Sequence, residues 1–292
     1  MTGILLIDKS EDWTSHDVVA KLRRLLGERR IGHAGTLDPM ATGLLTIFVG
    51  RATRAVSFAE AQEKTYIARL RLGITTDTQD ITGRVLTTAA ADMSAVDLEA
   101  VLSRFLGEIQ QVPPMYSAIK VDGQRLYKLA RQGVEVERKA RPVKIHRIAV
   151  LGQTEGNFEL EIVCSKGTYI RTLCHDIGAA LGCGGTMSAL RRTKVGAFSV
   201  ADAYTTAEVE ATENRSGLLQ PLDILFAAYP ALTVGSAQER GVRNGQTVAL
   251  ADGNPGLVRV YGQSGVFLAL GEVLSQRGLV LTTVKSFFAP DV

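Results

Sequence analysis

The sequence is poor in the residues that usually hold metal ions or form disulfides. Its 292 residues include only three cysteines and four histidines. No cysteine pair has the CxxC spacing of a zinc or redox motif, and the histidines do not complete a metal-ligand template. We therefore expect reduced cysteines in a cytoplasmic protein, with no metal and no cofactor; a zinc site is the less favoured alternative. The residues concerned are Cys164, Cys174, Cys183, His16, His33, His146 and His175.

Long apolar runs and targeting signals are also lacking. Residues 43–50 (GLLTIFVG) form one of the longest apolar stretches, far below the roughly 20 residues that a membrane helix needs. The N-terminus has no basic leader, so we expect no signal peptide. The composition, with 46% hydrophobic and 22% charged residues, is typical of a protein with a hydrophobic core. The length predicts one large domain or two unequal ones.

Neither sign of charge dominates the whole chain, because the net charge is only +3. The basic residues are nevertheless clustered. Residues 21–30 hold five basic side chains and one acidic side chain, and residues 119–147 hold nine basic and three acidic side chains. A further basic cluster lies within residues 191–194. Such clusters fit contacts to RNA phosphates, although solvated helix faces explain charge alone equally well.

The spacing of apolar residues predicts a mixed α+β fold. Buried or alternating patterns predict strands over residues 3–8, 65–72 and 158–164. Capping residues and helical spacing predict helices over residues 14–27, 94–105 and 170–181. Strands and helices do not alternate strictly, which favours a mixed, mainly antiparallel sheet flanked by helices.

The spacing of apolar segments and turn sequences changes near Tyr229. Short apolar segments are separated there by turn sequences such as Asn244-Gly245 and residues 252–256 (DGNPG). We expect a small all-β module over residues 229–292, joined to a main domain over residues 1–228.

The most unusual segment is GHAGTLDPMATG, residues 32–43. Its glycines permit backbone conformations closed to other residues, and Pro39 restricts the backbone of Asp38. A rigid turn would hold the Asp38 carboxylate in one direction. From the residues alone, an ordinary Asp-Pro turn is the favoured interpretation. The segment lacks the Gly-Lys-Ser/Thr ending of a P-loop and contains no GxGxxG motif.

A family resemblance changes this balance. Residues 32–45 (GHAGTLDPMATGLL) resemble the catalytic motif of the bacterial stand-alone TruB-type tRNA pseudouridine synthases, which places that family's essential aspartate at Asp38. Other segments similar to the family follow the same order: residues 14–19 (TSHDVV), 64–66 (KTY), 72–78 (LGITTDT), 113–120 (PPMYSAIK), 165–171 (SKGTYIR) and 190–193 (LRRT). One segment departs, because residues 9–15 (KSEDWTS) lack the proline and glycine of the family's Lys-Pro-x-Gly-x-Thr-Ser.

The resemblance implies an isomerase that converts uridine 55 in the T-loop of tRNA to pseudouridine. It implies Asp38 as the catalytic carboxylate, held ionised by Arg171 through a charge-assisted contact. Tyr66 is implied to stack on a uracil flipped out of the RNA. The other implied pocket residues are His33, Tyr169 and Leu190.

An insert over about residues 113–147 is implied to grip the T-arm of the tRNA, and the C-terminal module resembles a PUA-like RNA-binding domain. The expected partner is tRNA, without a guide RNA or a membrane, and the protein is expected to be a monomer. The candidate RNA contacts are Lys9, Lys64, Lys120, Arg125, Lys128, Arg131 and Arg141.

Three other functions are less favoured by the sequence. A guide-RNA-dependent synthase subunit is disfavoured by the short C-terminus and the lack of basic tails. A non-catalytic RNA-binding protein is disfavoured by the presence of Asp38, Tyr66 and Arg171 together. An aspartate-nucleophile hydrolase would need a second acid/base group or Mg²⁺-binding carboxylates, and none lies near Asp38 in the sequence.

Overall fold

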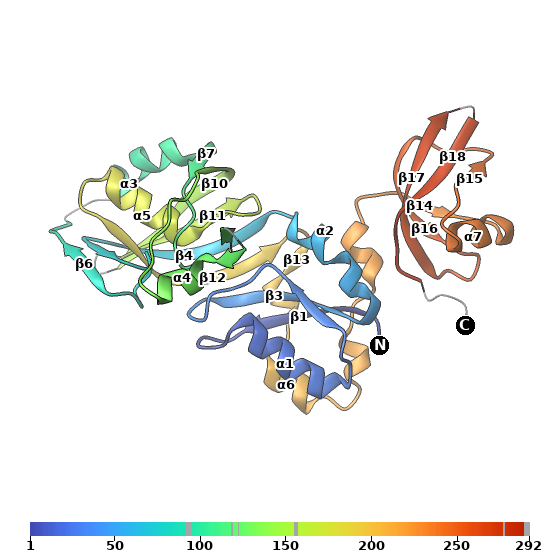
Figure 1. The fold of residues 1–292 in the computed structure, drawn as a ribbon, viewed down its shortest axis with the longest axis horizontal. Coiled ribbons are helices and arrows are strands. Elements are labelled where there is room, and N and C mark those ends of the chain that lie inside the picture. Colours follow the sequence, from blue (N-terminus) through green and yellow to red (C-terminus); the bar gives the residue numbers. More distant parts are fainter. Residues whose placement is uncertain (92–94, 118, 122, 155–156, 277, 289–292) are drawn as a thin grey trace.

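A large mixed sheet and a smaller β-rich module make up the molecule (Figure 1). The computed structural model describes residues 1–91, 95–117, 119–121, 123–154, 157–276 and 278–288. Ser94 and Ala118, which belong to predicted segments, lie outside these ranges. No helix of the described residues is long and apolar enough to cross a membrane.

The large sheet contains nine strands, seven of which follow one another in a single order. That order is β1 (Gly3–Lys9), β3 (Thr42–Val49), β12 (Gly185–Val195), β4 (Lys64–Leu72), β11 (Asn157–Cys164), β10 (Arg141–Thr154) and β7 (Gly107–Gln111). Two short strands, β2 (Ile31–Ala34) and β13 (Phe198–Ser199), pair with β3 and β12. Every pairing is antiparallel except the one between β3 and β12. The predicted mixed, mainly antiparallel sheet is thus confirmed.

The strands at the centre of the sheet have the predicted alternation. Along β4, Tyr66, Ala68, Leu70 and Leu72 are buried, whereas Arg69 and Arg71 are exposed. The same period holds in β11, where the even-numbered residues from 158 to 164 are buried. Side chains on a strand point alternately to the two faces, so one face of each strand joins the core.

Helices α1 (Ser15–Leu26) and α5 (Ile170–Ala180) hold the two sides of the candidate site. Thr14 caps α1 and forms a capping box with Asp17, and Gly27 ends the helix in the left-handed conformation, as predicted. Helix α5 buries Ile170, Leu173, Cys174 and Ile177 along one stripe. Helix α3 (Ala95–Leu102) is shorter than predicted because its last residues form a 3₁₀ turn, Ser103–Phe105.

Short elements complete the main domain. They are helices α2 (Val56–Glu60), α4 (Leu126–Arg131) and α6 (Thr206–Ala211), and the hairpins β5 (Ile74–Thr76) with β6 (Val85–Thr88) and β8 (Lys120–Val121) with β9 (Gln124–Arg125). The β8–β9 hairpin and α4 lie within the basic insert, residues 113–147.

The C-terminal part is β-rich, as expected, but not all-β. Its sheet has the order β14 (Ala231–Thr233), β16 (Gly256–Tyr261), β17 (Phe267–Gln276), β18 (Gly278–Ser286) and β15 (Val248–Leu250). Helix α7 (Ser236–Arg243) was not predicted. Its sequence, SAQERGVR, is polar and contains a glycine, so a helical apolar stripe is hard to recognise.

The two parts share an aromatic cluster. Phe226, which precedes the module, packs against Phe58 of α2 and against Phe267 and Phe287 of the module, with ring centroids 5.3, 6.0 and 5.7 Å apart respectively. The Tyr261 hydroxyl also donates a hydrogen bond to Asp223. The module is therefore packed onto the main domain by apolar and polar contacts.

Candidate active site

Asp38 lies in a tightly held loop, residues 35–41, between β2 and β3 (the Asp38 loop). Ser15, at the start of α1, fixes the loop on one side: its Oγ accepts from the Leu37 amide at 2.9 Å and lies 3.2 Å from the Leu37 carbonyl. Lys9 fixes the other side, because its Nζ donates to the Pro39 carbonyl at 3.1 Å. A further backbone bond, from Ala41 to the Asp38 carbonyl, closes the turn. The direction of the Asp38 side chain is therefore set by its surroundings.

Arg171 meets the Asp38 carboxylate from the first turn of α5. Its Nε lies 3.0 Å from Asp38 Oδ2, and its Nη2 lies 3.4 Å from Asp38 Oδ1. The same guanidinium donates from Nη1 to Asp80 Oδ2 at 3.2 Å and from Nη2 to the Tyr116 carbonyl at 2.8 Å. Such a fork is a geometry that lysine cannot reproduce. The structure thus brings Asp38 and Arg171 together, as the sequence predicted.

Asp38 is the accessible member of this group. Its side chain keeps 35% of its surface exposed, whereas Arg171 and Asp80 each keep 7%. Burial raises the pKa of the Asp38 carboxyl. The positive charges of Arg171 and Lys9 lower this pKa, whereas the negative charge of Asp80 raises it further, and the net shift is upward. Arg171 therefore reduces the rise in pKa without reversing it.

Asp80 is a site residue that the sequence did not reveal. Its Oδ1 accepts hydrogen bonds from the Thr82 amide, the Thr82 hydroxyl and the Thr78 hydroxyl, which leaves Oδ2 for Arg171. The sequence signal is an aspartate with a threonine two residues away on each side, which is also common in ordinary turns. Only the fold shows that this turn faces Arg171.

Both predicted aromatic residues lie near the Asp38 charge. Tyr66 is buried on β4 and Tyr169 is the N-cap residue of α5. Burial raises the pKa of both phenols, and the Asp38 charge adds to each rise, which places both within its electrostatic range. Gln111 of β7 fixes Tyr169, because its side chain donates to the Tyr169 carbonyl at 3.0 Å and accepts from the Tyr169 amide at 2.7 Å. Gln111 was also missed by the sequence analysis.

The two remaining predicted pocket residues lie on β12 and β2. Leu190 is buried on β12 and pairs with Ala68 of β4. His33 lies on β2, and its buried Nδ1 has no hydrogen-bond partner among the described residues. Burial lowers the pKa of His33, and the Arg192 and His16 charges lower it further, which favours the neutral imidazole.

Two of the predicted RNA contacts do not lie on the surface. Lys9 is 1% exposed and donates to the carbonyls of Ser10, Trp13 and Pro39. Lys64 is also buried, and it donates to the carbonyls of Glu60 and Gln62. Burial lowers the pKa of each ammonium to about 8. Both lysines therefore fix backbone next to the site.

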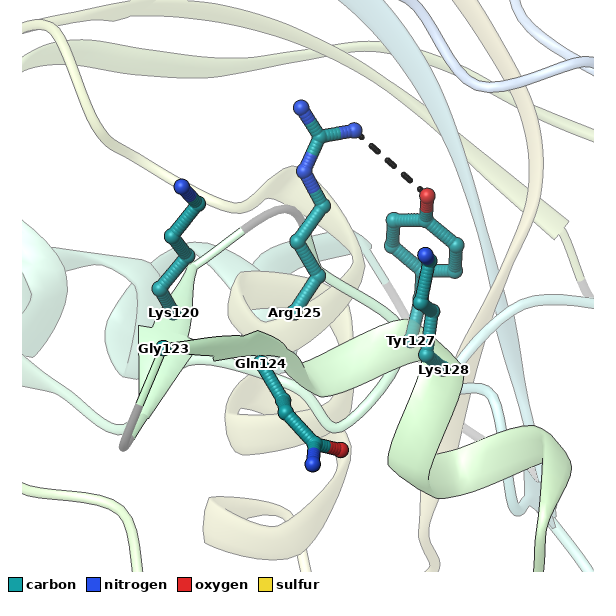
Figure 2. Close-up of a pocket in the computed structure, with 6 residues that line it drawn as sticks. All are labelled: Lys120, Gly123, Gln124, Arg125, Tyr127 and Lys128. Carbon is teal, nitrogen blue, oxygen red and sulfur yellow. Dashed lines mark hydrogen bonds between the residues drawn. The ribbon is translucent and has the colours of Figure 1, made fainter.

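The basic insert carries a shallow pocket of about 450 Å³. Figure 2 shows Lys120, Arg125 and Lys128 around it, with Arg125 donating to the Tyr127 hydroxyl at 3.4 Å. Gly123 and Gln124 complete the lining. The side chain of Arg131 lies outside the described part of the structure. Arg141 begins β10, is exposed, and its charge lowers the pKa of Tyr169, so it lies toward the site.

No metal-binding group emerges from the described residues. They contain no cluster of three or more histidine, cysteine, aspartate or glutamate side chains that could hold a metal ion. Burial raises the pKa of Cys164 to about 11 and that of Cys174 to about 12, which makes these thiols poor nucleophiles.

Comparison with known proteins identifies the family. The model "TruB family pseudouridylate synthase (N terminal domain)" matches residues 23–170, which is half of the chain, and two further models match residues 171–227 and 230–280. The chain belongs to the TruB family. The two C-terminal models are described as "tRNA pseudouridylate synthase B C-terminal domain" and "Pseudouridine synthase II TruB, C-terminal".

Relatives of this TruB family member are similar over most of their length. A tRNA pseudouridine synthase B of Aromatoleum aromaticum is 45% identical, covering 97% of this chain and 94% of the relative. One of Heliobacterium modesticaldum is 48% identical, covering 80% and 78% respectively. Among solved structures, a chain of a Cbf5-Nop10-Gar1 complex is 26% identical with a TM-score of 0.76, covering 99% of this chain and 85% of that one. These relatives identify the family member as a pseudouridine synthase, an isomerase.

Proposed function

We propose that this TruB family member converts uridine 55 in the T-loop of tRNA to pseudouridine. The observation that carries the proposal is the Asp38 carboxylate, partly exposed on a fixed loop and held by the Arg171 fork at 3.0 Å. The relatives named tRNA pseudouridine synthase B support the choice of tRNA. The substrate position follows from the family resemblance of residues 32–45.

In the reaction the bond between ribose C1′ and uracil N1 breaks, and the uracil rejoins C1′ through C5. As the new bond forms, C5 gives up its proton and the detached N1 takes up a proton, so the composition of the nucleotide is unchanged and the chemistry balances without an oxidant or a second substrate. Asp38 supplies the carboxylate beside the ribose and base, and the uridine reaches it by flipping out of the T-loop. Tyr66 stacks on the flipped uracil, while Tyr169, Leu190 and His33 complete the pocket.

Binding of the RNA is assigned to two parts of the chain. Lys120, Arg125 and Lys128 project from the basic insert and can meet phosphates of the T-arm. We divide the chain into a catalytic domain, residues 1–228, and a PUA-like RNA-binding module, residues 229–292; the separate five-stranded sheet supports this division. The enzyme acts as a cytoplasmic monomer on tRNA alone.

A guide-RNA-dependent subunit is the second candidate, because the chain also resembles proteins from the Cbf5-Nop10-Gar1 complex. Identity of 26% to that chain against 45% to the tRNA pseudouridine synthase B of Aromatoleum aromaticum favours the stand-alone enzyme. A T-arm stem-loop incubated with the purified protein alone separates the two. Modification without any other RNA or protein is the expected result.

Replacing Asp38 by asparagine tests the catalytic assignment. Asp38→Asn keeps the size of the side chain and removes its charge, so the variant should bind the stem-loop but form no pseudouridine. Pseudouridine mapping and a binding titration on the same RNA measure the two properties. Full conversion by Asp38→Asn would refute the assignment, and the absence of conversion by the unsubstituted protein would refute the function.

A further inference from the structure

Arg192 is a fully buried arginine beside the Asp38 loop. It lies on β12 and is 1% exposed. None of the carboxylates in the described residues forms an ion pair with it. A guanidinium buried away from water costs several kcal/mol unless its donors are satisfied. The hydrogen-bond partners of Arg192 therefore indicate the role of this buried guanidinium.

Those partners lie at the two ends of the Asp38 loop. Arg192 Nη2 donates to the carbonyl of Gly35, where the loop begins, at 2.9 Å. Arg192 Nε donates to the carbonyl of Leu44, in β3 just beyond the loop, at 2.7 Å. One planar side chain thus joins both ends of the segment that carries the catalytic carboxylate.

The backbone around Arg192 is equally close to the loop. Arg192 pairs with Gly43 in the parallel pairing between β12 and β3. A Cβ added at Gly43 would lie 2.3 Å from the Arg192 carbonyl oxygen, and one added at Gly35 would lie 3.2 Å from Arg192 Nη1. Gly35 of the loop and Gly43 of β3 therefore both lie close against Arg192.

Arg192 also reaches the residues that surround the substrate. It is the register partner of Tyr66 across β12 and β4. Its charge lowers the pKa values of His33 and Lys64 and opposes the rise of the Tyr66 pKa. Its charge therefore acts on His33 and Tyr66, two of the predicted pocket residues, and on Lys64.

We propose that Arg192 is a positioning residue for the reaction, joining Gly35, Leu44 and Tyr66 so that the Asp38 carboxylate meets the flipped uridine in the reactive orientation. The catalytic part of this inference rests on the proposed function. A displacement of about 1 Å in such a group can slow a reaction roughly 100-fold while binding is retained.

Arg192→Lys tests the proposal because lysine keeps the charge and loses the fork. The matched control is Arg215→Lys. Like Arg192, Arg215 donates to backbone carbonyls. Its three partners are the carbonyls of Leu25, Val209 and Glu210, which belong to α1 and α6 rather than to the Asp38 loop. Both variants lose a backbone-binding fork, so both should lose stability, and only one should affect the site.

Three measurements are made on both variants, well below their melting temperatures. Single-turnover conversion of a T-arm stem-loop should fall about 100-fold in Arg192→Lys, while its Kd for the RNA changes less than about threefold. Hydrogen exchange at the amides of residues 35–41 should become faster in Arg192→Lys. In Arg215→Lys, conversion and exchange in this loop should stay as in the unsubstituted protein.

Equal effects of the two lysine variants on conversion and on loop exchange would overturn the proposal. So would a loss of conversion that the weaker RNA binding fully explains. If Arg192→Lys does not fold, Gly35→Ala, which presses on the same guanidinium, should slow conversion with unchanged RNA binding, and normal conversion by it contradicts the proposal. An unsubstituted protein that forms no pseudouridine refutes the proposed function, whereas loop exchange still decides whether Arg192 positions Asp38.

Discussion

At the scale of single residues, Arg171 contacts two carboxylates that differ in solvent exposure. Asp80 is buried and saturated by hydrogen bonds from Thr78 and Thr82, whereas Asp38 keeps a third of its side chain exposed. The guanidinium also donates to the Tyr116 carbonyl, at the start of the basic insert. Asp80 thus fixes the arginine that in turn fixes Asp38, and it leaves the outer carboxylate free to meet a substrate.

The charge of Asp80 should be visible in the pH dependence of the reaction. In the proposed function Asp38 acts as a carboxylate, so activity should be lost as the pH falls through its pKa, which burial and Asp80 raise above the ordinary aspartate value. Asp80→Asn removes one of these causes. The acid limb of the single-turnover pH profile should therefore move to lower pH.

The same substitution should weaken the fold, since an asparagine cannot accept from Arg171 and from all the Thr78 and Thr82 donors together. The expected loss is about 1–3 kcal/mol of unfolding free energy, measured by denaturant titration. Asp77→Asn is the control, because Asp77 is exposed in the same turn and accepts from the Arg84 amide instead. An acid limb that moves equally in both variants would contradict this account.

The sequence predicts the residues of the site that belong to contiguous motifs. Asp38, Arg171, Tyr66 and Tyr169 were predicted from the sequence, because each lies in a segment similar to the family. Asp80 and Gln111 were not, since their partners are 91 and 58 residues away and only the folded chain brings them together. Lys9 and Lys64 were predicted as RNA contacts, whereas the fold buries both and directs their ammonium groups to backbone carbonyls. Lysine is rarely buried, so a local sequence pattern does not reveal this placement.

At the scale of elements, the parallel contact between β3 and β12 determines where the site forms. Arg191 pairs there with Thr42 and Arg192 with Gly43, so two strands far apart in the sequence meet beside the Asp38 loop. Gly43 has a φ of +96° and no room for a side chain. This position requires glycine for its conformation and for its close contact.

Gly43→Ala should therefore be strongly destabilising. The added methyl group would contact the Arg192 carbonyl while the backbone keeps a left-handed φ, and the two effects together should cost about 3 kcal/mol or more of unfolding free energy. Gly27→Ala is the matched control: Gly27 also has a positive φ, +60°, but nothing lies within 4 Å of its Cβ position. Its cost should be about 1 kcal/mol. Denaturant titrations of both variants provide the comparison, and equal costs would show that space at Gly43 is unimportant.

The elements themselves were predicted where a strict period exists. The alternation of β4 and β11 and the capping box of α1 depend on neighbouring residues, so they can be recognised locally. The strand order and the parallel contact depend on pairings between distant segments, and no local pattern specifies them. Helix α7 was missed because its sequence is polar overall and contains few apolar residues that could mark a buried stripe.

At the scale of the whole molecule, the C-terminal module is packed onto the main domain through Phe287. This ring belongs to the cluster that includes Phe226 and Phe58, whereas the next residue, Phe288, packs within the module and lies under the Arg243 guanidinium at 5.2 Å. Of these two adjacent phenylalanines, Phe287 therefore packs between the two parts and Phe288 packs within the module.

Phe287→Ala should loosen the module while leaving its own sheet folded. Truncating a buried phenylalanine costs about 3–5 kcal/mol, and here the loss falls on the contact between the two parts. Limited proteolysis should cut faster in residues 219–230, between the two parts. Phe288→Ala should not accelerate this cleavage, and the opposite order of the two variants would show that Phe287 does not hold the interface.

The long separation between Asp38 and its arginines also bears on how the protein is made. The Arg171 contact spans 133 residues of chain, and the bond from Arg192 to Leu44 spans 148. While the chain emerges from the ribosome, β1, α1 and β3 are available early, but their central neighbour β12 is synthesised only after residue 185. A nascent chain that stops short of β12 therefore has its carboxylate without the strand that secures it, and the site is completed late in synthesis.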